Sequence, residues 1–93
     1  MPVAIRIPTP LRHFSGGNGK VSVEGSTGIV LDALERLWEL HPALRDRIVN
    51  EQGQVREHIN IFVGEENIRF TGGLATPVSD GSEILIFPAV SGG

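Results

Sequence analysis

Hydrophobic and polar residues alternate near the start of the chain, and a period of two is typical of a β-strand with one buried face. Val3, Ile5 and Ile7 alternate with small or charged residues before two prolines end the pattern. The same alternation returns over residues 20–24. Because the glycine-rich residues 15–19 lie between these segments and predict a turn, we expect the two strands to pair as a hairpin.

A helical pattern follows over residues 29–40. Its apolar positions recur every three or four residues and therefore share one face, which comprises Val30, Leu34, Leu37 and Trp38. Ser26 or Thr27 is placed to cap the N-terminus of this helix. Pro42 either ends the helix or opens a short second helix over residues 44–49.

Three further apolar segments lie in the C-terminal half of the chain. Residues 58–63 and 68–70 are expected to be strands, and a tight turn at residues 79–82 leads into a last strand over residues 83–87. This last strand is apolar on both faces, one formed by Ile84 and Ile86 and the other by Leu85 and Phe87. Such a strand is expected at the centre of a sheet, or with one face covered by a partner.

The order of elements is strand, strand, helix and three strands, which predicts an α+β fold. An N-terminal hairpin, a crossover helix and a late central strand together favour the β-grasp, ubiquitin-like roll. In this roll a mixed sheet of four to five strands packs on one main helix. We expect a single domain over residues 1–93 that ends in a flexible tail, residues 88–93.

Composition narrows the classes of function. The chain has 93 residues, a net charge of −3 and no cysteine, so it offers neither a basic stripe for nucleic acid nor a thiol for catalysis. No apolar run approaches the ~20 residues that span a bilayer. The first residues lack the pattern of a signal peptide, and a cytoplasmic protein is therefore expected.

The tail carries the most unusual chemistry of the chain. It ends in Val90, Ser91, Gly92 and Gly93. A terminal carboxylate is an inert anion at neutral pH and becomes an electrophile only when another enzyme activates it. Two glycines without Cβ atoms can pass through a narrow tunnel and approach a nucleotide closely.

Two motifs connect this tail to a known family. Val78-Ser79-Asp80-Gly81-Ser82-Glu83 resembles a turn described as apolar-x-Asp-Gly-Asp-x, and Pro88-Ala89-Val90-Ser91-Gly92-Gly93 resembles the ending Pro-x-Val-Ala-Gly-Gly, with Ser91 at the alanine position. Over its whole length the chain resembles the small β-grasp sulfur carriers of the ThiS/MoaD/CysO family. Residues 7–12 and 68–76 look closest to the CysO-type branch.

The resemblance implies a function and a set of partners. An adenylating, E1-like enzyme would use ATP and magnesium to activate Gly93, and a persulfide sulfur would then convert it to a thiocarboxylate. The sulfur would pass to an acceptor held by a second enzyme, such as a cysteine synthase, with molybdopterin or thiamine synthesis as other destinations. The chain itself would be no enzyme and would bind no cofactor. The tail motif would comprise Pro88, Ala89, Val90, Ser91 and Gly92.

Three residues are candidates for contact with the activating enzyme. If Ile84 and Ile86 face the helix, Leu85 and Phe87 join Phe62 on the outer face of the sheet. Exposed apolar patches mark sites of protein contact, and relatives dock their activating enzyme through an apolar sheet face beside the tail. The alternative is that Leu85 and Phe87 face the helix instead, or that a loop covers the patch.

Other polar clusters favour structural roles. His13, His41 and His58 lack metal-ligand spacing, so no metal site is expected. Glu65 and Glu66 are adjacent in a turn and are expected to be solvated rather than to act as an acid/base pair. Residues 15–20 lie in a hairpin and lack the spacing of a phosphate-binding loop.

Two alternatives to a free sulfur carrier stay open. Adenylation of Gly93 would serve equally a ubiquitin-like modifier that is conjugated to target lysines. A permanent subunit of a synthase is the other possibility. Lys20 is the only lysine beside seven arginines, so self-conjugation could use only Lys20 and the N-terminal amine.

Overall fold

The protein is described from a computed structural model that covers residues 2–24 and 28–88. Over these residues the α-helices are α1 and α2, and four short 3₁₀ helices lie in the connections. The bounds in chain order are β1 Val3–Arg6, η1 Thr9–Ser15, β2 Lys20–Val23, β3 Gly28–Ile29, α1 Val30–Leu40, η2 Pro42–Leu44, α2 Arg45–Ile48, β4 Ile59–Val63, β5 Glu66–Asn67, η3 Ile68–Phe70, η4 Gly73–Ala75, β6 Pro77–Val78 and β7 Glu83–Pro88.

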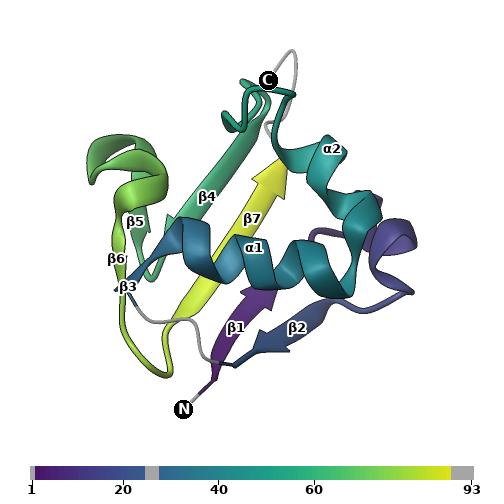
Figure 1. Ribbon diagram of the computed structural model, residues 1–93, viewed down its shortest axis with the longest axis horizontal. Coiled ribbons are helices and arrows are strands. Elements are labelled where there is room, and N and C mark those ends of the chain that lie inside the picture. The colour runs from purple at the N-terminus through teal and green to yellow at the C-terminus, as the bar shows by residue number, and fades with distance from the viewer. Residues whose placement is uncertain (1, 25–27, 89–93) are drawn as a thin grey trace.

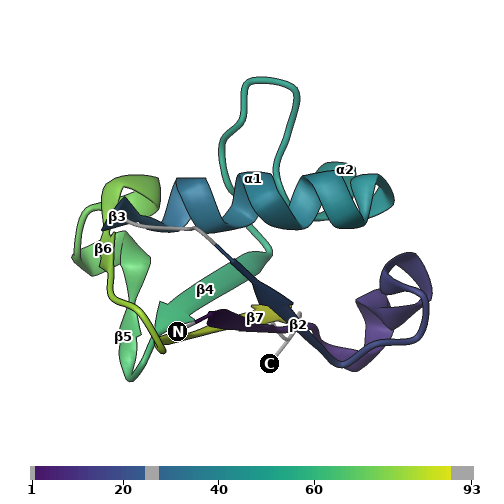
Figure 2. The same cartoon turned by 60° about the horizontal axis from the view of Figure 1, so that its bottom comes forward.

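A mixed five-stranded sheet forms one layer of the molecule, in the order β2-β1-β7-β4-β5. The pair β1 and β7 is parallel, whereas the other neighbours are antiparallel. Helix α1 crosses one face of this sheet, and Figure 2 shows the helix layer on one side and the opposite face uncovered. The expected α+β, β-grasp arrangement is confirmed.

The hydrophobic core lies between the sheet and α1. Leu34 and Leu37 of the helix are fully buried, as are Ile5, Ile61 and Ile84 of the strands. They belong to one continuous apolar cluster. The apolar face of the helix and the apolar faces of the strands pack against each other. Trp38 is half-buried and packs on the edge of the cluster, so it covers the core rather than filling its centre.

The strand β7 occupies the centre of the sheet (Figure 1), as its two apolar faces predicted. It is reached through a turn in which Ser82 N–H donates to Ser79 O at 3.0 Å. Gly81 has a φ of +80° there, a conformation that glycine adopts without a steric cost. Because β7 runs parallel to β1, Pro88 lies at the opposite end of the sheet from Val3.

The start of α1 differs from the prediction. Ile29 is the N-cap residue, and the predicted capping residues Ser26 and Thr27 lie outside the described residues. Gly28 and Ile29 instead form β3, which pairs with β6 in a small second sheet. The Oδ2 atom of Asp32 accepts the Ile29 N–H at 3.4 Å, so a carboxylate inside the first turn supplies the capping acceptor.

The predicted strand at residues 68–70 is wrong, because η3 occupies these positions. Asn67 Oδ1 accepts the backbone N–H of Arg69 at 3.0 Å and starts the 3₁₀ helix. The last two residues before η3 form the short strand β5 instead. This local hydrogen bond to the Asn67 side chain therefore outweighs the strand preference that the alternation of Ile68, Arg69 and Phe70 indicates.

Candidate functional site

The outer face of the sheet carries the three predicted docking residues. Ile84 and Ile86 are buried against the helix layer, with exposed fractions of 0% and 1%. Successive side chains of a strand point to opposite faces, so Leu85 and Phe87 lie on the outer face. Phe87 is 46% exposed and Leu85 is half-buried. The predicted phase of this strand is confirmed, whereas the role of the face in docking stays a prediction.

Phe62 and Phe87 form an aromatic pair on this face. Their ring centroids are 5.8 Å apart and their planes meet at 78°, an edge-to-face arrangement. The register explains the contact, because Phe62 lies opposite Leu85 and therefore diagonal to Phe87 across two antiparallel strands. The sheet thus brings together residues that are 25 positions apart in the sequence.

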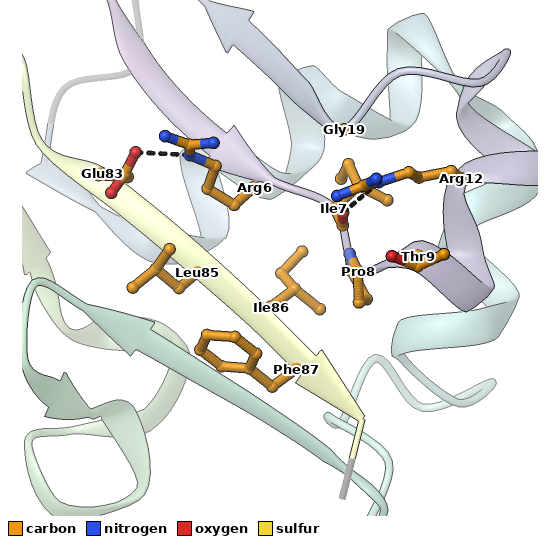
Figure 3. A pocket seen from close by; sticks show the side chains of 10 residues that line it. All are labelled: Arg6, Ile7, Pro8, Thr9, Arg12, Gly19, Glu83, Leu85, Ile86 and Phe87. Atoms are coloured by element: carbon orange, nitrogen blue, oxygen red, sulfur yellow. Dashed lines mark hydrogen bonds and ion pairs between the residues drawn. The ribbon is translucent and has the colours of Figure 1, made fainter.

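A groove of about 430 Å³ runs beside Leu85 and Phe87 (Figure 3). Its other wall comes from β1 and η1 and includes Arg6, Pro8 and Arg12. The groove thus combines apolar side chains of β7 with cationic side chains of the neighbouring elements.

Two interactions position the cationic side chains of this groove. Arg6 Nε donates to Glu83 Oε2 at 2.8 Å, and both partners are partly exposed. Arg12 Nε donates to the Ile7 carbonyl at 3.1 Å. A Cβ at Gly19 would lie 2.9 Å from Arg12 Cζ, so the absence of a side chain at Gly19 makes room for this guanidinium.

Strand β7, which carries Leu85 and Phe87, ends toward the top of the sheet in Figure 1. Pro88 is paired with Ile59 at the end of β7 and is half-buried. The predicted activation site Gly93 and the tail residues Ala89, Val90, Ser91 and Gly92 lie outside the described residues. Six residues, 88–93, reach at most ~20 Å when extended.

Among the described residues, the buried polar side chains are those of Ser15 and Thr76, and no carboxylate or histidine is buried. Within residues 2–24 and 28–88, no three His, Asp or Glu side chains gather in a way that could hold a metal ion. Over the same residues, no helix has the length and apolar character needed to cross a membrane.

Sequence reasoning missed part of this surface. Arg6 and Arg12 line the groove because β1 and η1 lie beside β7. No pattern in the local sequence predicts that these elements are neighbours. Phe70 was placed in a strand, but it projects from η3 with 86% of its surface exposed. The signal that could have placed it is Asn67, whose type often caps short helices.

Comparison with known proteins identifies the family. The model of the ThiS family matches residues 5–93. The chain belongs to the ThiS family. The resemblance inferred from the turn and tail motifs is therefore confirmed.

Curated relatives include two named classes of small protein. The sulfur carrier protein CysO of Mycobacterium tuberculosis is 40% identical over 96 aligned positions that cover all of both chains. The small archaeal modifier protein 1 of Haloferax volcanii is 36% identical over 74 positions, which cover 80% of this chain and 79% of the relative.

Solved structures agree with this placement. CysO in the Amycolatopsis orientalis BexX/CysO complex is 38% identical, with a TM-score of 0.86, and the match covers 98% of this chain and 99% of that chain. The small archaeal modifier protein 1 of Haloferax volcanii has a TM-score of 0.82 at 30% identity, with full coverage of both chains. Carriers and modifiers therefore share the fold described above.

Proposed function

We propose that this chain is a sulfur carrier whose C-terminal Gly93 is adenylated and then converted to a thiocarboxylate. The observation that carries the proposal is the match to CysO over the full length of both chains. The match of the family model runs through Gly92 and Gly93, the residues that the chemistry needs. The first candidate for the receiving pathway is cysteine synthesis, with molybdopterin or thiamine synthesis as other destinations.

The chemistry is supplied by partner enzymes. A carboxylate oxygen of Gly93 attacks the α-phosphate of ATP and pyrophosphate leaves, with magnesium held by the activating enzyme. The terminal sulfur of a persulfide then attacks the acyl carbon and AMP leaves. A thiol cleaves the remaining sulfur–sulfur bond and departs as a disulfide with the donor, so that sulfur replaces one terminal oxygen of Gly93. A second enzyme, such as a cysteine synthase, takes the sulfur from the thiocarboxylate. This chain is not the catalyst of any of these steps.

We assign two roles to the chain itself: its outer sheet face binds the activating enzyme, and its tail carries Gly93 to the active site of that enzyme. Phe62, Leu85 and Phe87 form an apolar face of the kind that marks protein contacts, and we assign to it the binding of the activating enzyme. Pro88 follows Phe87 directly, so an enzyme bound to this face has the tail within reach of its active site. A similar chain is held by a second protein in the BexX/CysO complex, which supports a partner-dependent role.

Intact-mass analysis tests the proposal. The purified chain is incubated with ATP, magnesium, the adenylating enzyme from the same genome and a sulfur donor. The expected product is heavier by the replacement of one oxygen with one sulfur, and fragmentation places the change at Gly93. An unchanged mass together with no ATP–pyrophosphate exchange by the enzyme would contradict the proposal.

A ubiquitin-like modifier is the second candidate. The similarity to small archaeal modifier protein 1 favours it, because that relative matches four fifths of the chain. The modifier requires the same adenylation but transfers Gly93 to lysine amines. The two candidates therefore differ in product: a free thiocarboxylate for the carrier and isopeptide-linked adducts for the modifier.

A further inference from the structure

Phe70 is the most exposed large apolar residue that the structure describes, with 86% of its surface open. The residues on either side of it are held in place. Ile68 is buried in the core, and the Arg69 guanidinium donates from Nη2 to the carbonyls of Glu57 and Ile59 at 2.9 and 3.1 Å. Thr71 N–H also bonds to Ile68 O at 3.1 Å. The backbone around the ring is thus held on both sides, which presents Phe70 outward as a preorganised contact.

Phe70 lines a groove with Phe62, one member of the outer-face aromatic pair. The groove has a volume of about 550 Å³ and is bounded by Phe62, Glu65, Glu66, Asn67 and Phe70. Phe62 in turn contacts Phe87, so aromatic surface continues from the end of β7 to η3. We call the groove between Phe62 and Phe70 the aromatic–acidic groove.

The carboxylates of this groove have no cationic partner within the described part of the chain. The ion pairs of residues 2–24 and 28–88 involve Glu83, Glu39 and Asp46, but neither Glu65 nor Glu66. Arg69, the nearest base in sequence, donates to backbone carbonyls instead. Two aromatic rings and two negative charges therefore face the same open volume.

This combination fits a guanidinium group. An arginine side chain stacks on aromatic faces through cation–π attraction and donates paired hydrogen bonds to carboxylates. Its weakly hydrated head makes it better suited than lysine to a partly desolvated interface. An apolar side chain would leave both carboxylates to be desolvated without compensation.

We propose that the aromatic–acidic groove binds an arginine side chain of the activating enzyme. The proposal rests on the proposed function, because it makes the groove an extension of the face that docks that enzyme. Phe62 links the two regions, so one partner surface can cover Phe87, Phe62 and Phe70 together. A second copy of this chain is disfavoured as the occupant, because its net charge of −3 opposes self-association.

The test measures the dissociation constant of the complex with the purified activating enzyme by titration calorimetry at two salt concentrations. Phe70→Ala should weaken binding about thirtyfold, the size of a desolvated cation–π contact converted to affinity. The double variant Glu65→Gln and Glu66→Gln should also weaken binding, and it should lower the salt dependence of the affinity.

Matched controls lie on other surfaces. Leu40→Ala truncates another exposed apolar side chain, and the double variant Glu35→Gln and Glu51→Gln removes the same number of charges elsewhere. Both controls should bind as the wild type does. Circular dichroism and thermal melting of every variant show that the fold is retained.

The outcomes separate the two proposals. If Phe70→Ala and the Glu65/Glu66 variant bind like the wild type while Phe87→Asp does not, the groove proposal fails and the docking face stands. If Phe70→Ala changes only the sedimentation of the free chain, the occupant is a second copy and the proposal also fails. A wild-type chain that the enzyme neither binds nor adenylates would overturn the proposed function and this proposal with it.

Discussion

At the scale of single residues, exposure separates the part of β7 that supports the fold from the part that is available to a partner. Ile84 and Ile86 are buried, whereas Phe87 on the opposite face keeps 46% of its surface open. A substitution at Ile84 or Ile86 therefore disturbs the core, whereas a substitution at Phe87 alters the outer surface. The alternation could be predicted from sequence because side chains of a strand alternate strictly between two faces.

Phe87→Asp tests this division. We expect binding to the activating enzyme to weaken by about thirtyfold or more, as for a central interface aromatic. The fold should persist, because the ring is already partly solvated and its contact with Phe62 contributes only about 0.5–1.5 kcal/mol beyond burial. Calorimetric titration and urea unfolding measure the two effects. Ile86→Ala is the control, with an expected loss of stability of about 2–5 kcal/mol.

Gly93 is the residue at which the proposed adenylation takes place. Deleting Gly93, or adding one residue after it, should abolish adenylation because the activated carboxylate is displaced from the nucleotide. The melting temperature should not change, because the core lies between α1 and the sheet. ATP–pyrophosphate exchange with the activating enzyme measures the effect. Normal thiocarboxylate formation by an extended chain, without trimming to Gly93, would contradict this expectation.

At the scale of elements, regular patterns were predictable and short irregular ones were not. The strands β1, β2, β4 and β7 and helix α1 repeat an apolar period long enough to identify. The two-residue strands β3 and β6 span a single period of two, so the pattern does not repeat within them and leaves no signal. Segment 68–70 has the right alternation for a strand, but the local hydrogen bond that Arg69 N–H donates to Asn67 Oδ1 favours the 3₁₀ helix.

Asn67→Ala tests the importance of that bond. Loss of the acceptor for Arg69 N–H should destabilise the protein by about 1 kcal/mol, the usual size of a capping contribution. It should also release Phe70 from its outward position and so weaken binding to the activating enzyme. Urea unfolding measures the stability. Asn67→Asp keeps the acceptor oxygen and should retain most of it; equal losses in both variants would show that the cap is not the cause.

At the scale of the whole molecule, the sheet joins surfaces that the sequence keeps apart. Phe62, Phe70 and Phe87 come from β4, η3 and β7, and Arg6 and Arg12 of the groove beside Leu85 come from β1 and η1. The family and its fold could be predicted because the turn and tail motifs are contiguous. The arrangement of charges beside the docking face could not, because it depends on which strands are neighbours.

The number and place of lysines in the whole molecule bear on whether it acts as a carrier or as a modifier. Lys20 is the only lysine and is exposed on the edge strand β2, so ubiquitin-like chains could grow only there or at the N-terminal amine. Arginine offers no alternative, because its guanidinium stays protonated and is a poor nucleophile. We therefore expect free protein to dominate in cells, with covalent conjugates scarce.

A denaturing immunoblot of cell extract, beside a strain without the activating enzyme, measures this balance. A dense ladder of adducts that disappears in that strain would favour the modifier, whereas a single free band that carries the thiocarboxylate when sulfur demand is high agrees with the carrier. Lys20→Arg is the matched control, because it should remove self-linked chains through Lys20 and leave thiocarboxylate formation unchanged.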